Sequence, residues 1–162
     1  MAISLVVIVL SLTFFVSGVF LDFKITSDTS CWIVGPTSTG GYAIIHNTIS
    51  GWNTNLMDAN WIWDINLNTA AGFGVVTKHF YIPGTPNSGT FRIAADNRFT
   101  TYLNNLDANC KSTYDTTFST VDGILCNVKS YLRSGLNVLV VSVENTGGNA
   151  GVMFKLEVTS NY

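Results

Sequence analysis

The chain has 162 residues, of which 47% are hydrophobic and 11% are charged, with a formal net charge of -2. This length suits one domain, and so apolar a composition excludes an intrinsically disordered chain. The acidic balance provides no basic surface, which argues against a nucleic-acid partner. Because charged residues are scarce, Asn, Thr and Ser must supply the polar surface, as suits an extracellular protein.

The N-terminal segment is almost wholly apolar and uncharged from Ala2 to Phe20. We interpret residues 1–18 as a secretory signal peptide cleaved after Gly18, which leaves residues 19–162 as a single domain. The alternative is an uncleaved membrane anchor, since the run approaches the ~20 residues that span a bilayer. Polar residues within the run and the lack of basic flanks argue against the anchor. No later segment is long and apolar enough to span a membrane.

Short strands and turns account for the first half of the chain. Strands are expected at residues 23–30, 31–34, 42–45, 61–64 and 75–82, with residues 50–60 irregular and 83–89 forming a turn. Trp61 and Trp63 share one face of their strand, so at least one of them should enter the core. In the strand at 75–82, Val76, Phe80 and Ile82 alternate with polar residues.

Residues 90–106 carry the clearest strand pattern and predict three segments folded back on one another. Phe91, Ile93 and Ala95 alternate with Thr90, Arg92 and Ala94 before Asp96-Asn97-Arg98 interrupts the run. Asn104-Asn105 then predicts a tight hairpin, because Asn tolerates the positive φ that such a turn imposes.

The C-terminal third continues the all-β pattern. We expect a long polar surface loop over residues 107–124, a helical turn at 128–133 and a strand buried on both faces at 138–144. The last strand should place Val152, Phe154, Leu156 and Val158 inward and Met153, Lys155, Glu157 and Thr159 outward. Strands at this spacing predict an antiparallel β-sandwich or jelly roll.

Three cysteines are present, and secretion would permit disulfides. Three single pairings are open, and we favour Cys110 with Cys126, which would close a loop worth ~3 kcal/mol. Cys31 is then left over. It is either buried beside Trp32 as a small apolar group or exposed and available for an intermolecular bridge.

Several segments in register resemble the galactose-binding-like β-sandwich, a jelly-roll module of many glycoside hydrolases and secreted lectin-like proteins. They are NWIWD at 60–64, FYIP at 80–83, FRIAADN at 91–97, YLN at 102–104, GLNVLVV at 135–141 and EN at 144–145. The chain departs from the pattern in having Asn104-Asn105 where Asn-Gly is usual, and in the long insertion with two cysteines. The resemblance implies a fold, and sugar binding through loops at one end of the sandwich.

Sugar recognition needs an aromatic plate for the pyranose ring and amides or carboxylates for its hydroxyls. Trp52 is the candidate plate, with Asn53, Asn55 and Asp58 as polar neighbours, and Tyr114 in the long loop is a further candidate. The alternatives are a tryptophan packed under a loop and, for Tyr114, packing against Phe118.

Metal and catalytic motifs are weak. A structural calcium ion would suit the fold, but Asp107-Ala108-Asn109 lacks the rest of a calcium loop, so no metal ligands are assigned. His46 and His79 lack ligand partners at suitable spacing. Asp58, Asp64 and Asp115 would have to supply any glycosidase pair, and nothing in their spacing singles them out.

The sequence therefore predicts a secreted, non-catalytic carbohydrate-binding module. The alternative is an extracellular structural or assembly protein, a matrix, coat or filament subunit that forms homo-oligomers through sheet edges or Cys31. A small hydrolase is a third interpretation, for which a catalytic pair is missing.

Overall fold

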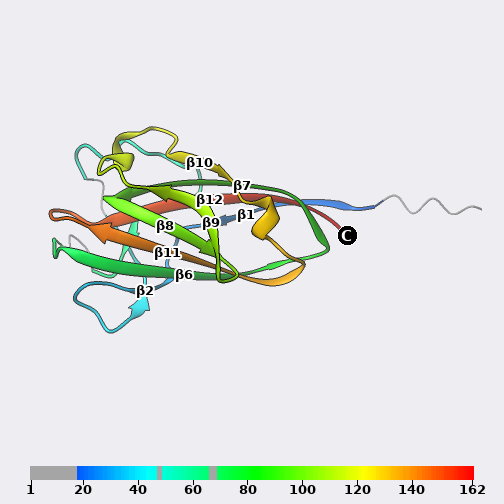
Figure 1. The fold of residues 1–162 in the computed structure, drawn as a ribbon, viewed down its shortest axis with the longest axis horizontal. Coiled ribbons are helices and arrows are strands. Elements are labelled where there is room, and N and C mark those ends of the chain that lie inside the picture. The colour runs from blue at the N-terminus through cyan, green and yellow to red at the C-terminus, as the bar shows by residue number, and fades with distance from the viewer. Residues whose placement is uncertain (1–17, 47–48, 66–68) are drawn as a thin grey trace, which may run out of the picture.

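The computed structural model describes residues 18–46, 49–65 and 69–162, and it forms two antiparallel six-stranded sheets (Figure 1). The fold class is the all-β sandwich that the sequence predicts. Residues 1–17 of the expected signal peptide lie outside the described residues, so its cleavage stays a prediction. No helix in the described part is long and apolar enough to cross a membrane.

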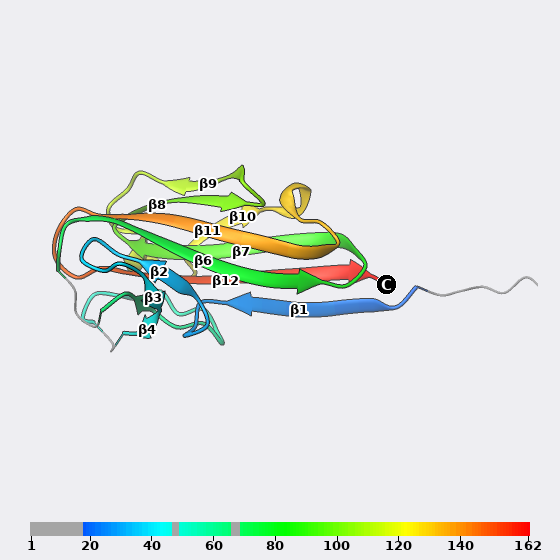
Figure 2. The ribbon, with the colours of Figure 1, turned by 90° about the horizontal axis from the view of Figure 1, so that it is seen from below.

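The first sheet, called sheet A, has the strand order β10-β7-β12-β5-β4, with β1 also paired to β12 (Figure 2). Its strands are β1 (Phe20–Thr26), β4 (Ile44–Ile45), β5 (Ile62–Trp63), β7 (Thr85–Asp96), β10 (Ile124–Asn127) and β12 (Gly151–Asn161).

The second sheet, called sheet B, has the order β3-β2-β6-β11-β8-β9. Its strands are β2 (Trp32–Val34), β3 (Gly41–Tyr42), β6 (Gly72–Ile82), β8 (Arg98–Leu103), β9 (Leu106–Ser112) and β11 (Gly135–Asn145). Two short 3-10 helices, η1 (Thr117–Ser119) and η2 (Lys129–Tyr131), complete the described elements; η2 falls within the predicted helical turn.

The core lies between the sheets and is filled by the alternating residues that the sequence singles out. Phe91 of β7 and Phe154 of β12 are fully buried, with ring centroids 5.8 Å apart. From sheet B, Val76, Phe80 and Ile82 point into the same core. Trp63 is buried in this core, which confirms the prediction of at least one core tryptophan, but Trp61 is buried in a second cluster, so the prediction that the two share one face is wrong.

The hairpin predicted at Asn104-Asn105 joins β8 to β9. Both residues have positive φ, 53° and 67°, which is the conformation that Asn tolerates better than most residues. The Asn104 amide also donates to the Tyr131 carbonyl oxygen at 2.8 Å and to Asn137 Oδ1 at 2.8 Å. The turn is therefore held to two later segments of the chain.

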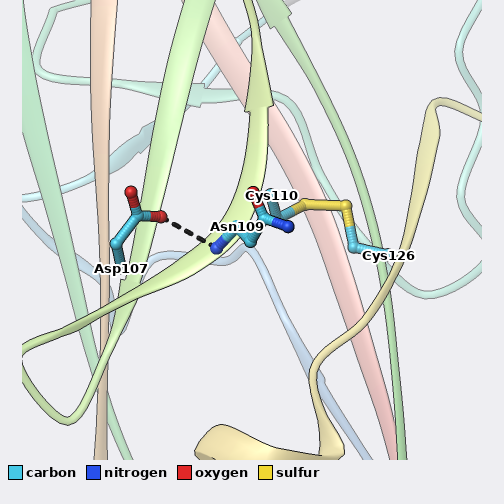
Figure 3. The surroundings of a disulfide bond; sticks show 4 residues. All are labelled: Asp107, Asn109, Cys110 and Cys126. Carbon is cyan, nitrogen blue, oxygen red and sulfur yellow. Dashed lines mark hydrogen bonds between the residues drawn. A yellow bond between two sulfur atoms is a disulfide. The ribbon is translucent and has the colours of Figure 1, made fainter.

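The disulfide joins Cys110 of β9 to Cys126 of β10, the pairing favoured from the sequence (Figure 3). Because β9 is an edge strand of sheet B and β10 is an edge strand of sheet A, the bond connects the two sheets along one side. Asp107 Oδ1 accepts a hydrogen bond from the Asn109 amide at 2.8 Å, where a register shift bends β9.

Several local predictions are wrong in detail. The three segments of residues 90–106 do not all pair with one another, because β7 lies in sheet A while β8 and β9 pair in sheet B, and the strand expected at 23–30 ends at Thr26. The loop expected at 107–124 begins with strand β9, because hairpin pairing to β8 extends through Ser112. The turn expected at 83–89 is shorter, since β7 starts at Thr85 by pairing with the end of β12.

Two further errors concern burial. Strand β11 is buried on one face only, with Leu139, Val141 and Val143 inward and the alternate residues part-exposed. Met153 is buried although it points away from the core.

Cys31 is the free cysteine among the described residues and is fully buried. Burial raises the pKa of its thiol, which disfavours the reactive thiolate. The first of the two sequence interpretations, a buried apolar group, therefore holds, and an intermolecular bridge through Cys31 would require local opening of the fold.

Candidate functional site

A second, smaller hydrophobic cluster lies on the outer face of sheet A. Ala94 of β7 and Met153 of β12 point away from the main core, and they pack beneath Trp52, Leu56 and Trp61. These last residues belong to the irregular segment that precedes β5. The chain therefore folds back over the outside of its own sheet, which explains why Met153 is buried.

Three aromatic rings are stacked within this cluster. The Trp52 and Trp61 ring centroids lie 4.2 Å apart, and the His46 ring lies 5.6 Å from Trp52 in an edge arrangement. Gly151 makes room for the stack, because a Cβ there would lie 2.5 Å from Trp52 Cη2. The position of Trp52 is thus set by the absence of a side chain on the strand below it.

The Trp52 indole is also fixed by a buried hydrogen bond. Its Nε1 donates to Asp96 Oδ2 at 2.9 Å. Burial raises the pKa of the Asp96 carboxyl, the Trp52 hydrogen bond opposes that shift, and the charge of Asp115 adds to it. The pKa of His46 is lowered by its burial, so this ring is neutral at physiological pH.

The segment carrying Trp52 is anchored to the turn around η1. The backbone amides of Asn53 and Asn55 donate to the carbonyl oxygens of Phe118 and Val121 at 2.8 and 3.0 Å. In turn, Thr117 Oγ1 exchanges hydrogen bonds with the Ala95 backbone at 2.8 and 3.0 Å. Two segments that are far apart in the sequence thereby form one rigid unit on β7.

A surface cavity of about 350 Å³ lies at the outer face of sheet A, between the Trp52 segment and β12. Its polar lining comes chiefly from asparagines, and its apolar lining from the aromatic stack and neighbouring side chains. The lining residues are Ile45, His46, Ile49, Trp52, Asn53, Thr54, Asn55, Ala59, Asn60, Trp61 and Met153. Asn53 and Asn55 are exposed, so their amides are available to a ligand.

The structure brings together three of the five predicted binding residues, Trp52, Asn53 and Asn55. The expectation that Trp52 is an exposed plate is wrong, since it is only 8% exposed and is packed under its own loop. Asp58 lies outside the cavity lining, and its carboxylate pairs with Lys24 Nζ at 3.0 Å. Tyr114 also lies outside the lining and is largely exposed. Their roles stay predictions.

Sequence reasoning missed His46, Asn60 and Asp96 as parts of this site. None of the three stands in a motif, and Asp96 was assigned only to a turn. Outside this site, sequence reasoning also did not identify Trp32 as an exposed aromatic residue, although it is the one tryptophan of the four with substantial exposure. A signal for Trp32 existed, because alternation of Cys31 and Ile33 inward places it outward.

The carboxylates considered for catalysis do not converge. Asp115 pairs with Arg98 Nε at 2.6 Å, Asp58 pairs with Lys24, and Asp64 is buried against Gly35. Among residues 18–46, 49–65 and 69–162, no group of three or more His, Cys, Asp or Glu side chains is placed to hold a metal ion. The structural calcium ion therefore has no such cluster to support it and stays a prediction.

Comparisons with known proteins give structural matches only. No known family and no curated protein matches the sequence. Among solved structures, an α-L-rhamnosidase from Streptomyces avermitilis, complexed with L-rhamnose, matches with 20% identity and a TM-score of 0.53 over 79% of this chain. The fold is the galactose-binding-like β-sandwich.

Two further matches agree on this fold. A glycosyl hydrolase family 2 member from Bacteroides cellulosilyticus matches with 17% identity and a TM-score of 0.51 over 83% of the chain. A putative β-galactosidase from Bacteroides fragilis matches with 16% identity and a TM-score of 0.51 over 85% of it. This chain covers only 12%, 20% and 23% of the three proteins, so the likeness concerns one part of each.

Proposed function

We propose that the protein is a non-catalytic carbohydrate-binding protein that acts outside the cell, and that the cavity over sheet A takes a sugar. The observation that carries the proposal is the lining of this cavity. Asn53, Asn55 and Asn60 line a space of about 350 Å³ together with Trp52 and Trp61. That volume falls within the usual range of small-ligand sites.

The chemistry of this lining matches a neutral sugar. An amide offers both a donor and an acceptor, as a sugar hydroxyl group does, so three asparagines can pair with several hydroxyls at once. Trp52 and Trp61 are mostly buried, and the atoms that they present to the cavity, together with Ile49 and Met153, give it an apolar wall that suits the carbon atoms of a sugar ring. Because the stack is fixed by Gly151 and Asp96, little side-chain ordering remains to oppose binding.

Two features support an extracellular location. The Cys110–Cys126 disulfide would persist only in an oxidising compartment. The apolar segment ahead of Val19 is the expected signal peptide. A non-catalytic role is supported by the three scattered aspartates, none of which lines the cavity: Asp58 and Asp115 are ion-paired, and Asp64 is buried. The fold itself also occurs as a part of proteins that act on carbohydrates, which is consistent with the proposal.

A glycan-array screen of the full chain tests the proposal. Wild-type protein should bind a limited set of glycans, and the double variant Asn53→Ala/Asn55→Ala should weaken that binding at least about tenfold, since it removes two amides. Asn161→Ala, an exposed asparagine at the far end of β12, serves as the control and should bind as wild type does. Equal binding by all three proteins, or no binding by folded wild type, would contradict it.

The assembly alternative is less well supported. An intermolecular disulfide through Cys31 is disfavoured, because the thiol is buried. Assembly through sheet edges meets two-residue edge strands at β3 and β4 and a disulfide between β9 and β10, so β1, which has seven residues and pairs with β12 alone, is the longer edge that is left among the described strands. Short or tied edges are how sheets avoid adding strands from other molecules.

A further inference from the structure

The outer face of sheet B carries many exposed apolar side chains. They come from five strands, and no other described segment covers them. They are Trp32 and Val34 of β2, Tyr42 of β3, Phe73, Val75 and Tyr81 of β6, Tyr102 of β8 and Leu136 of β11. An exposed patch of this kind on a single domain generally marks a binding surface.

The strand register places the aromatic residues in one row across the sheet. Tyr42 pairs with Trp32, Trp32 with Thr77, Thr77 with Val140, and Val140 with Tyr102. In Figure 2 the strands of sheet B follow one another from β9 at the top to β3 below. Trp32 and Tyr42 are 46% and 71% exposed, and their ring centroids are 5.7 Å apart.

A hollow of about 210 Å³ lies on the same face beside this row. Hydroxyl groups and one exposed aromatic ring line most of it, with an ion pair at one end. The lining residues are Phe73, Arg98, Phe99, Thr100, Ser112, Thr113, Ser142 and Glu144. Ser142 pairs with Val75, which pairs with Val34 of β2, and these two strand spacings are about 10 Å across the sheet.

We propose that this face is a second binding surface, which takes an extended neutral polysaccharide chain running from Trp32 and Tyr42 to the hollow beside Phe73. The rings would contact the carbon faces of sugar residues, and Thr100 and Ser142 would pair with hydroxyls. This surface lies on the opposite sheet from the cavity, so it goes beyond the proposed function and is tested separately.

The charged side chains that line the hollow are paired with one another, which favours a neutral ligand. Arg98 is held by Asp115 at 2.6 Å and by Glu144 at 3.5 Å, so the hollow carries no unpaired cation for an acidic polymer or a lipid headgroup. The remaining charges near the row, Asp107 and Lys111, belong to edge strand β9 and are of opposite sign. The central outward residues Thr77, Val138 and Val140 are uncharged, and His79 of β6 is also exposed on this face.

Area argues against a second copy of the chain as the occupant. From β3 to β8 the face spans four strand spacings, and from Phe73 to Tyr81 it spans eight residues, which together give about 500 Å². A stable dimer interface buries about 800 Å² on each partner. A polysaccharide needs no such area, because its affinity accumulates along a narrow track of ring contacts.

The test is electrophoresis of the full chain in native gels that contain soluble xylan, mixed-linkage β-glucan, galactomannan or, as the charged comparison, polygalacturonate. At least one neutral polymer should retard the protein, and Trp32→Ala and Phe73→Ala should each weaken this binding about tenfold. Tyr162→Ala removes an exposed ring that lies outside this face and should leave the binding unchanged. The cavity variant Asn53→Ala/Asn55→Ala should also leave it unchanged, which separates the two sites.

Three results would overturn the proposal. They are retardation by none of the neutral polymers, retardation that Trp32→Ala leaves intact, and retardation by polygalacturonate alone. Light scattering on the same samples gives a fourth. If wild type is a dimer and Trp32→Ala is a monomer, a second copy of the chain occupies the face.

Discussion

The outer faces of the two sheets both carry tryptophan, but they place it in opposite surroundings. On sheet A, Trp52 is 8% exposed because the chain returns over the sheet and packs it onto Ala94 and Met153. On sheet B, Trp32 is 46% exposed and no described segment crosses above it. A tryptophan that stands beside asparagines in the sequence, such as Trp52, can therefore be packed beneath a site. Trp32, which has no such neighbours, is the one that exposes its ring.

The contrast between the two tryptophans is tested most strongly by replacing each of them with alanine. Trp52→Ala should lower the free energy of unfolding by about 3–5 kcal/mol, because it empties a packed cluster and leaves the Asp96 carboxylate without its donor. Trp32→Ala should cost about 1 kcal/mol or less, since its ring is half in water already. Urea unfolding measures both, and equal losses would contradict the assigned packing.

The disulfide should matter to both faces alike, since it joins the edges of the two sheets. Reduction, or the double variant Cys110→Ala/Cys126→Ala, should lower the free energy of unfolding by about 3 kcal/mol for a sequence separation of 16. Cys31 is unchanged in the double variant and serves as the internal thiol control. If reduction to three free thiols left the urea midpoint unmoved, the bond would not contribute as argued.

Two glycine substitutions sharpen the comparison without touching a tryptophan. Gly151→Ala should cost about 1–3 kcal/mol, because its Cβ would meet the Trp52 ring at 2.5 Å. Gly41→Ala on β3 places its Cβ in open space and should change stability by less than about 0.5 kcal/mol. Thermal unfolding of the two variants, with near-ultraviolet circular dichroism of the indoles, measures the contrast. If Gly151→Ala changed neither the unfolding temperature nor the indole signal, Trp52 would not pack on β12.

The smallest expected effect is on the pH dependence of stability. Burial raises the pKa of Asp96 in the folded protein above the ordinary value of 3.8, so its contribution to stability is full below pH 3.8 and is lost as pH rises through the raised pKa. Asp96→Asn keeps an acceptor for Trp52 but cannot ionise, so it should lose less stability between pH 3.8 and 7 than wild type. Urea midpoints across this range measure the difference, and parallel curves would contradict the assignment.

Much of the fold could be predicted because it rests on local pattern. Alternation placed Phe91, Phe154 and Val76 in the core, and the φ tolerance of Asn identified the hairpin at residues 104–105. The short turn before β7 and the start of β9 escaped prediction, because cross-strand pairing extended the strands into polar residues.

The site could be predicted only in part, for a different physical reason. Asn53 and Asn55 were found from their polarity beside an aromatic residue, and they do line the cavity. The burial of Trp52 could be given only as an alternative, because it depends on Gly151 and Asp96, which are far away in the sequence. Such tertiary contacts leave no periodic signal near Trp52 itself.

The most direct test of carbohydrate binding without catalysis is a single incubation of the full chain with a panel of insoluble and soluble polysaccharides. Retained protein and newly formed reducing ends are measured in the same samples. The account predicts retention on at least one polysaccharide with no increase in reducing ends over protein-free controls. Release of reducing ends that purified protein sustains, or the absence of retention on every polysaccharide by folded protein, would contradict it.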